Sequence, residues 1–394
     1  MGAPIPEIFA GMSSAIALWQ WGTAARFPLH VRTRPGQSPG VTVFKPLRGA
    51  DERTAECLRS WFEQRYGGVV QLLFGARSES DPVREVVMGL MREFPEVHAE
   101  WVTCGEDWGT NGKISSLAQM EARALHPFWV VSDADVWAPP DLLEQLAARL
   151  NLAAPVVWTC LYRLQPGSSG ASRWEAFVAN TDFWSQVLQA RDLRPLDFAL
   201  GAVMAMPRHV AGRCGGFRAF SDYLADDYQL GQRLVRSGGA VELCPVVVEC
   251  RGGRLGWASA WRHQLRWART IRVCKPVQYF LCLLANTTLW LLVWMASHSG
   301  GGVVATGLAL LMLRGLGALD LEARLGLGKV RWFDCWKVWA KDLAQAGVWL
   351  AAHCGRTVEW GGERFVVAAD GSMRREHSGS GGGGITLTRS RASR

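Results

Sequence analysis

The sequence predicts an α/β fold with a mostly parallel, doubly wound sheet, flanked by helical segments at both ends of the chain. Between Val41 and Cys250, short apolar runs alternate with stretches of helical periodicity. This alternation is typical of strand–helix–strand units that share one sheet. The apolar run at 128–135 ends in acidic residues. Ligands of doubly wound sheets bind at the carboxyl ends of the strands, so these acids mark a candidate site.

The expected elements follow one another regularly through this region. Strands are predicted at 41–44, 69–76, 98–104 and 128–135, and helices at 53–64, 83–94 and 114–125. Residues 40–250 are therefore assigned to one domain, which is large enough to be a catalytic domain. The Pro- and Gly-containing stretch 32–40 is expected to link it to the N-terminal segment.

The composition predicts a soluble domain accompanied by a few membrane segments. The chain has 394 residues, of which 49% are apolar and 20 are Trp, with a mean hydropathy of +0.03. A purely soluble protein is usually more polar, and a polytopic transporter is more apolar. The ten Cys show no C-x-x-C spacing, which indicates reduced cytosolic thiols and excludes a disulfide or zinc framework.

Residues 1–30 are expected to form an N-terminal membrane anchor. Residues 8–25 carry no charge, and their length is near the roughly 20 residues that a spanning helix needs. A signal peptide is the alternative, but a basic start and a cleavage site are missing. Arginines follow this segment and Glu7 precedes it, so the positive-inside rule places the following domain in the cytoplasm.

A basic amphipathic segment is expected at 251–275. It carries six Arg and one Lys and no acid, while Trp257, Trp261 and Leu265 recur at helical spacing. These features predict a helix that lies on a membrane surface. Nucleic-acid binding is a second interpretation of a basic, aromatic stretch. It ranks lower because an apolar segment follows at once, and no nucleic-acid partner is expected.

Residues 276–372 are expected to hold C-terminal membrane helices and a hairpin. The uncharged stretch 277–295 is long enough to span, whereas 300–313 is shorter and would require Arg314 to snorkel. The stretch 332–354 carries charges among its Trp residues, so it either lies at the interface or packs against the other helices. Residues 355–373 resemble a small hairpin, and a disordered tail is expected over 373–394.

Two sequence motifs have the residue types of a phosphate and metal site. Asp133 and Asp135 follow a buried strand, and two carboxylates there suit a hard divalent cation that carries phosphates. The alternative is a turn cap before two prolines. Asn111-Gly112-Lys113 predicts a tight turn and a helix start, where backbone N–H groups and a Lys would suit a pyrophosphate. An ordinary strand-to-helix turn is the alternative.

Two further motifs lie near the end of the domain. The acids Asp226 and Asp227 begin a helix that glycines close. Asp226 with Gln229 resembles a capping box. The helix dipole would stabilise the Asp227 carboxylate, and Asp227 is also well placed to act as a general base. The pentapeptide 263–267, HQLRW, joins basic and aromatic residues and would also suit interfacial anchoring.

The order of these motifs resembles the membrane-embedded glycosyltransferases of the ceramide glucosyltransferase type, in glycosyltransferase families 2 and 21. It is most similar to their bacterial, hopanoid-biosynthesis-associated branch. The resemblance covers about residues 8–372, and the KPLRG stretch at 45–49 is similar to the family's opening. The pattern consists of three aspartates followed by (Q/R)-x-x-R-W, and its ordered occurrence is specific.

The resemblance implies a GT-A-type fold and a role for each matched residue. Lys45, Asp81, Lys113 and Asp133 would bind the nucleotide sugar, and Asp133 with Asp135 would hold Mg²⁺ or Mn²⁺. Asp227 would be the base that activates the acceptor, and Arg266 and Trp267 would complete the catalytic set. His263 stands where the family has Gln or Arg, which leaves its catalytic role open.

The implied activity is inverting transfer of glucose or N-acetylglucosamine from a UDP-sugar to the hydroxyl of a ceramide-like or hopanoid membrane lipid. The implied location is the inner membrane, crossed more than once, with the catalytic domain in the cytoplasm. The alternatives are a processive polysaccharide synthase, a catalytically silent nucleotide-sugar-binding membrane protein and, ranked last, a soluble nucleotidyltransferase.

Overall fold

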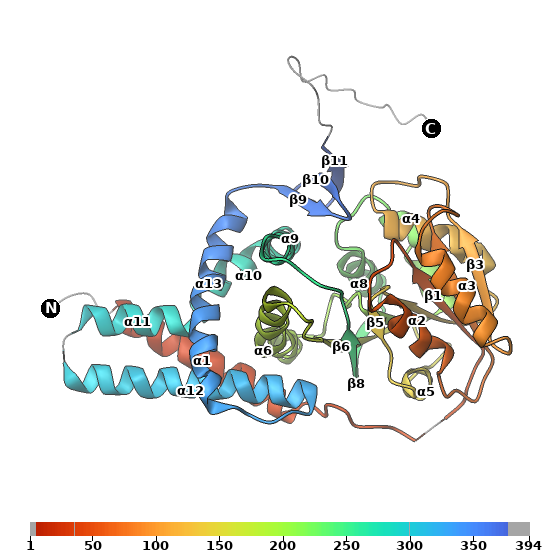
Figure 1. The fold of residues 1–394 in the computed structure, drawn as a ribbon. Coiled ribbons are helices and arrows are strands. Elements are labelled where there is room, and N and C mark those ends of the chain that lie inside the picture. Colours follow the sequence, from red (N-terminus) through yellow and green to blue (C-terminus); the bar gives the residue numbers. More distant parts are fainter. Residues whose placement is uncertain (1–4, 35, 299, 377–394) are drawn as a thin grey trace, which may run out of the picture.

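One half of the molecule is an eight-stranded mixed sheet with short helices on both faces, and the other half is a group of long helices (Figure 1). The computed structural model describes residues 5–34, 36–298 and 300–376. The strand order is β3-β2-β1-β4-β7-β6-β8-β5. The strands are β1 Val41–Pro46, β2 Val70–Ala76, β3 His98–Thr103, β4 Phe128–Ser132, β5 Val136–Trp137, β6 Val156–Leu164, β7 Val203–Pro207 and β8 Ala240–Cys250.

The sheet is mostly parallel, as predicted, but it reverses at β7. Strand β1 pairs parallel with β2 and β4, β2 pairs parallel with β3, and β6 pairs parallel with β8. Strand β7 runs antiparallel to both β4 and β6, and β5 runs antiparallel to β8. Side chains that alternate along β4 enter two separate cores: Trp129 and Val131 in one, Phe128 and Val130 in the other. Both faces of the sheet are therefore covered, as continuous apolar strands require.

The helices around the sheet are short. They are α2 Thr54–Phe62, α3 Val83–Glu93, α4 Gly112–Met120, α5 Leu142–Ala147, α7 Arg208–Arg213 and α8 Asp226–Arg236, with 3₁₀ turns η1 Glu121–Arg123 and η2 Phe217–Phe220. Helix α2 buries Cys57, Trp61 and Phe62, the side that its periodicity predicts. Helix α4 begins at Asn111, whose side chain accepts the N–H of Ile114 at 3.1 Å.

The second half consists of long helices. They are α1 Ile5–Arg26, α6 Gly170–Leu193, α9 Trp257–Cys274, α10 Pro276–Leu281, α11 Thr287–Ser297, α12 Gly301–Gly326 and α13 Cys335–His353, with η3 Cys282–Ala285 and η4 Trp332–Asp334. Helices α6 and α9 lie between the sheet and the outer helices (Figure 1). Helix α1 packs against α6, α11 and α12, and α13 packs against α9, α11 and α12.

By length and composition, α12 is the one helix of the described residues that is long and apolar enough to cross a membrane. A second span is present only if α10–η3 and α11, which meet at a bend of 50°, count as one. The span expected over 277–295 therefore stays a prediction, and the structure adds a bend within it. The chain breaks at Asn286, whose side chain accepts the N–H of Leu289 at 3.1 Å and starts a new helix. The N-terminal anchor stays a prediction.

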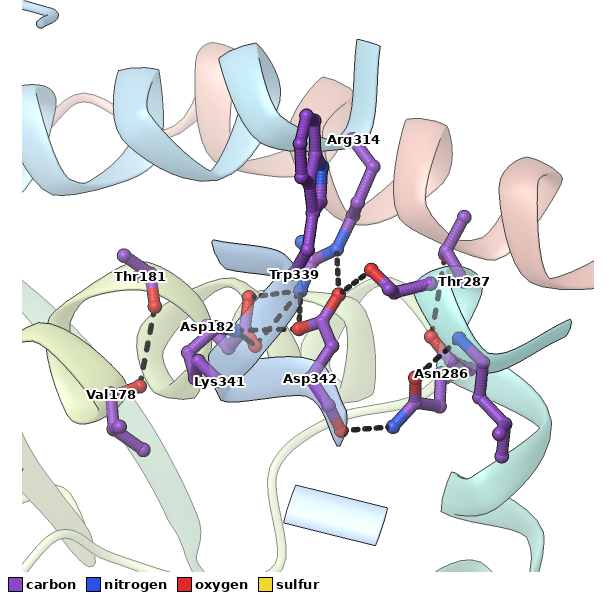
Figure 2. Close-up of polar contacts among 12 residues, drawn as sticks. Val178, Thr181, Asp182, Asn286, Thr287, Arg314, Trp339, Lys341 and Asp342 are labelled. Atoms are coloured by element: carbon purple, nitrogen blue, oxygen red, sulfur yellow. Dashed lines mark hydrogen bonds and ion pairs between the residues drawn. The ribbon is translucent and has the colours of Figure 1, made fainter. Parts of the chain in front are cut away.

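Arg314 does not snorkel toward an interface, contrary to expectation, because it lies inside a buried ionic network (Figure 2). Its Nη2 donates to Asp182 at 2.9 Å and to Asp342 at 2.9 Å. Lys341 binds both acids, and Thr288 Oγ1 donates to Asp342 at 2.7 Å. The network joins α6, α11, α12 and α13. Burying charges is costly unless every one is paired, and here two cations face two carboxylates.

A small antiparallel sheet follows α13, which confirms the expected hairpin. Its strands are β9 Thr357–Trp360, β10 Glu363–Val367 and β11 Met373–Arg375. Strand β11 occupies the start of the segment expected to be disordered, and residues 377–394 lie outside the described residues. The N–H of Leu224 donates to Gly371 at 3.1 Å, and the N–H of Met373 donates to Asp222 at 2.6 Å. The small sheet thus holds the loop that leads into α8.

Candidate active site

A cavity of about 1860 Å³ lies between the carboxyl ends of the central strands and helices α6, α9 and α13. It brings together seven of the nine residues that the sequence predicts for the site. These are Asp81, Lys113, Asp133, Asp135, Asp227, Arg266 and Trp267. Lys45 and His263 do not line it. A nucleotide sugar fills only part of such a volume, since ligand pockets commonly measure about 300–1,000 Å³.

Lys113 is the centre of the charged part of this cavity. Its Nζ lies 2.7 Å from Oδ1 of Asp133 and 3.3 Å from Oδ2 of Asp226. The N-cap of α4 fixes its backbone, and the end of β4 fixes that of Asp133. Burial would lower the pKa of Lys113, but Asp133 and Asp226 outweigh it and raise that pKa. The lysine is therefore a fixed positive charge.

A glycine makes room for this arrangement on the opposite wall. A Cβ at Gly201 would lie 3.1 Å from Oδ2 of Asp227 and 3.5 Å from Nζ of Lys113. The first distance is tighter than ordinary van der Waals contact. Any side chain at Gly201 would therefore displace the acid or occupy the space in front of it.

The expected capping box at the start of α8 is wrong. The N-cap is Ala225, and no side chain caps this helix. Asp226 is instead buried and turned toward Lys113, so its carboxylate pairs with an ammonium rather than with backbone N–H groups. Asp227 Oδ1 accepts its neighbour Tyr228's N–H at 2.7 Å. Burial, and then the charge of Asp226, raise the pKa of Asp227 to about 6.

Lys45, expected to contact the nucleotide, lies beneath the site instead. Its side chain is fully buried, with Nζ 5.0 Å from the centre of the Trp61 ring. The ammonium donates to Ser132 Oγ at 3.2 Å and to the carbonyl of Asp133. Burial lowers the pKa of Lys45 to about 8. Lys45 therefore supports the turn that presents Asp133 and does not itself face the cavity.

Asp81 joins two loops at another edge of the cavity. Its two carboxylate oxygens accept the N–H of Gly49 at 3.0 and 3.1 Å, and Oδ1 also accepts the N–H of Val83 at 3.0 Å. Gly49 has φ of +67°, a left-handed conformation that favours glycine. The loop after β1 is thereby held beside the loop after β2, and the cavity opens between them.

Asp133 and Asp135 fit the expected divalent cation by their chemistry. Both line the cavity, and loss of solvation, then the charge of Asp133, raise the pKa of Asp135 to about 6. No cluster of three or more His, Cys, Asp or Glu side chains suited to a metal occurs within 5–34, 36–298 and 300–376. Mg²⁺ commonly takes one or two carboxylates and completes its shell with water and substrate phosphates. Two acids are therefore a sufficient protein contribution.

The 263–267 motif lies on α9, and its side chains point in two different directions. Arg266 and Trp267 line the cavity. Burial lowers the pKa of Arg266, which Asp133 and then Glu175 counteract. His263 turns away toward α6, where its Nδ1 lies 3.3 Å from Oε1 of the buried Glu175. His263 thus lies beside α6 and outside the cavity lining, and its catalytic role stays a prediction.

Most basic side chains of α9 point into the protein. The sequence predicted a helix whose basic side chains would instead face a membrane surface. Arg272 Nη2 donates to the carbonyl of Gly355 at 2.7 Å, and Arg269 donates to that of Thr357. Lys275 Nζ lies 2.6 Å from Oδ2 of Asp197. Trp257 and Trp261 are exposed, so these two aromatic side chains remain available for the predicted contact with a membrane surface.

Sequence reasoning missed the acids that α6 and the loop after it contribute. Glu175 faces the α9 motif, Asp182 lies in the ionic network and in the cavity wall, and Asp197 binds Lys275. One signal was available. Asp182 is the one acid within the largely apolar stretch 176–184, and such an acid needs a buried partner.

Comparison with known proteins now gives the family. Residues 6–373 match the family described as Glycosyl transferase family 21. The chain belongs to this glycosyltransferase family. This family 21 glycosyltransferase is 29% identical over 218 residues to ceramide glucosyltransferase 3 of Caenorhabditis elegans, a match that covers 54% of this chain and 47% of the relative. It is 29% identical over 123 residues to the Candida albicans ceramide glucosyltransferase, covering 28% and 23%.

A solved structure confirms the GT-A-type fold of this glycosyltransferase. A mannosyltransferase from Pyrobaculum calidifontis, solved with GDP-Man and Mn²⁺, superposes with a TM-score of 0.53 at 18% sequence identity. The superposition covers 89% of this chain and 98% of the mannosyltransferase. The sequence matches to these curated relatives span under half of their length.

Proposed function

We propose that this glycosyltransferase moves a hexose from a UDP-sugar to the hydroxyl of a membrane lipid, with inversion at the anomeric carbon. The observation that carries the proposal is the position of Asp227. It is a carboxylate with a raised pKa, in a cavity that also contains the Lys113–Asp133 pair and continues between apolar helices. Relatives named ceramide glucosyltransferases support glucose as donor sugar and a ceramide-like acceptor, and N-acetylglucosamine and a hopanoid remain the alternatives.

The donor's diphosphate would lie between Lys113 and the Asp133–Asp135 pair. Lys113 would donate to a phosphate oxygen, and Asp133 and Asp135 would hold Mg²⁺ or Mn²⁺. Mg²⁺ or Mn²⁺ bound there supplies positive charge that stabilises the leaving diphosphate. Asp81, at the far edge, would hold the nucleoside end, and Lys45 would keep the Asp133 turn in place.

Asp227 would act as the general base. An acceptor hydroxyl attacks the anomeric carbon from the face opposite the leaving UDP, and its proton passes to the Asp227 carboxylate as the new bond forms. A pKa of about 6 leaves most of the carboxylate ionised at neutral pH and still basic enough to take the proton. Arg266 contributes a second fixed positive charge to the same cavity, which favours departure of the diphosphate.

The lipid acceptor would enter from the helical half. Cavity walls on α6, α9 and α13 include Phe183, Trp267 and Trp349, which are suited to an apolar body. Helix α12 and the bent pair α10–α11 are the candidate membrane contacts, together with the predicted anchor α1. We propose that they hold the enzyme at the cytoplasmic membrane, with the sheet half in the cytoplasm.

The deciding experiment incubates membranes that contain the full-length protein with labelled UDP-glucose or UDP-N-acetylglucosamine, and identifies the lipid product by mass spectrometry. We expect one sugar per lipid. A polymer would instead indicate a processive synthase, and UDP binding without any product would indicate a silent binder.

The base assignment has its own test. Asp227→Asn should bind UDP as the wild type does but lose transfer by about a thousandfold, within the range for a missing general base. Glu96→Gln, at an exposed position in the turn between α3 and β3, serves as the control. Normal turnover by Asp227→Asn would refute the assignment.

A further inference from the structure

The cavity wall farthest from the sheet contains a group of polar side chains among apolar ones. The apolar members there include Val178, Ile271, Leu283, Ala346 and Trp349. The polar members come from four helices and the end of η3, and they are Asp182, Gln264, Asn286, Arg314, Asp342 and Gln345. None of them has a role in the transfer step described above. Polar groups within an otherwise apolar ligand pocket usually fix the orientation of a ligand.

Two of these residues form an amide pair across the cavity wall. Gln345 Nε2 on α13 donates to Gln264 Oε1 on α9 at 3.1 Å. Gln264 Nε2 is buried and has no hydrogen-bond partner among the described residues. Two amides that bond once retain an unused donor and an unused acceptor, whichever way each is turned. A buried donor without a partner costs about 1–3 kcal/mol, so a ligand that supplies an acceptor there gains that energy.

The neighbouring ionic network sets the charge that this wall accepts. Asp342 lies one helical turn before Gln345 on α13 and binds Arg314 and Lys341 (Figure 2). Asp182 binds the same two cations. Two carboxylates thus neutralise two cations, and neither cation is left to pair with a phosphate. The wall therefore favours an uncharged ligand group over an anionic one.

We propose that the Gln264–Gln345 pair is an acceptor subsite. It binds an uncharged polar group of the lipid that has both a hydrogen-bond donor and an acceptor, such as an amide or a second hydroxyl, while another hydroxyl faces Asp227. This inference rests on the proposed function, because it assumes a lipid acceptor in the same cavity. It adds a requirement: the acceptor carries a second polar group, and a plain long-chain alcohol is a poor substrate.

The test compares two acceptors in one assay of the full-length enzyme in membranes or detergent. The first is ceramide, which has an amide and a second hydroxyl, and the second is a long-chain primary alcohol without either. Gln264→Met and Gln345→Met keep the side-chain length and remove the amides. Gln37→Leu, at an exposed loop position outside the cavity, is the matched control.

The wild type should prefer ceramide, and each cavity variant should lose about tenfold in kcat/KM for ceramide. The alcohol's kcat/KM and the KM for the UDP-sugar should stay unchanged. An equal loss with both acceptors would show a merely structural link between α9 and α13, and no loss with ceramide would also overturn the subsite. A wild type that transfers to neither lipid, and to no lipid of the membranes in the experiment above, would refute the proposed function instead, so the two failures are distinguishable.

Discussion

The Lys113 ammonium lies 2.7 Å from the Asp133 carboxylate, across the carboxyl end of β4. It joins the two motifs that sequence analysis treats separately, the N-G-K turn and the acids after the fourth strand. A third residue, Asp226, lies 3.3 Å from the same nitrogen. One lysine therefore compensates two acids that would otherwise repel each other and Asp227.

The first prediction concerns the loss of this lysine. Lys113→Met should lower the free energy of unfolding by about 2 kcal/mol, because it leaves charged groups inside the cavity without a partner. It should also raise the KM for the UDP-sugar by at least tenfold, because the diphosphate loses its cation. Thermal unfolding and steady-state kinetics measure the two effects. Lys329→Met, at an exposed position, is the control. A variant with an unchanged donor KM would remove Lys113 from the donor site.

The second prediction concerns pH. The proposed base Asp227 must be ionised to take a proton, and its pKa is raised to about 6, so log kcat/KM should rise with a slope of one up to about pH 6 and then level off. The charge of Asp226 contributes to that raised pKa. Asp226→Asn should therefore shift the midpoint to lower pH. Asp141→Asn, which lies outside the cavity lining and pairs with Arg32, should leave it in place. A midpoint that moves upward in Asp226→Asn would contradict this electrostatic account.

The third prediction follows from the same pKa by linkage. A carboxyl whose folded pKa lies above its unfolded value of 3.8 contributes stability below pH 3.8, which is lost as pH rises through about 6. At pH 7 the ionised Asp227 therefore destabilises the substrate-free protein. Asp227→Asn should raise the free energy of unfolding at pH 7 by roughly 2 kcal/mol and should leave it nearly unchanged at pH 4. Denaturant titrations at the two pH values check this, and a destabilised variant at pH 7 would contradict it.

The sequence predicted much of the charged cavity wall because its residues follow local rules. Asp133 and Lys113 adjoin strand and helix ends, and the carboxyl ends of parallel strands meet at one edge of the sheet. Asp226 was misinterpreted because Asp-x-x-Gln fits a capping pattern equally well. In the structure the N-cap residue is Ala225, one residue earlier, and the Asp226 carboxylate forms an ion pair with Lys113, which is distant in sequence. A long-range ion pair leaves no local signal.

The segment between 140 and 222 and the helical half were harder to predict for a related reason. Sequence analysis gives no element between 140 and 222, where the structure has β6, the 24-residue α6 and β7. Helix α6 contacts α1, α9, α12 and β6, so apolar residues occur around its circumference and its periodicity is blurred. Arg314 was expected to reach out of the membrane because its partner Asp182 is 132 residues away in sequence.

The fourth prediction concerns Lys45. Its ammonium is fully buried and its pKa is lowered to about 8, so the charge itself is costly to keep. Lys45→Met should change the free energy of unfolding by no more than about 1 kcal/mol, because lost hydrogen bonds are offset by removal of a buried charge. Activity should nevertheless fall, with a higher requirement for added Mg²⁺ or Mn²⁺, because Asp133 loses its support. Metal titrations of activity, together with thermal unfolding, separate these effects. A fold that collapses would show a structural role only.

The last prediction concerns His263 on α9 and Glu175 on α6, whose Nδ1 and Oε1 atoms lie 3.3 Å apart. His263 occupies the position at which the motif of the resembled family has Gln or Arg. His263→Ala removes the imidazole nitrogen that lies 3.3 Å from Oε1 of the buried Glu175, an oxygen without a hydrogen-bond partner among the described residues, and should cost at most about 1 kcal/mol of unfolding free energy. It should also lower kcat, because Arg266 and Trp267 lie on the next turn of the same helix. His263→Gln should restore both, since an amide N–H replaces the ring nitrogen.

A double-mutant cycle tests the coupling directly. In Glu175→Gln the buried partner is already neutral, so adding His263→Ala should cost less than it does in the wild type. Arg262→Ala is the control one residue away, because its pairing with Glu359 at 3.3 Å is exposed on both sides and should matter by less than about 0.5 kcal/mol. Additive effects of the two changes would mean that His263 and Glu175 do not act together, and the histidine's position in the motif would then need another explanation.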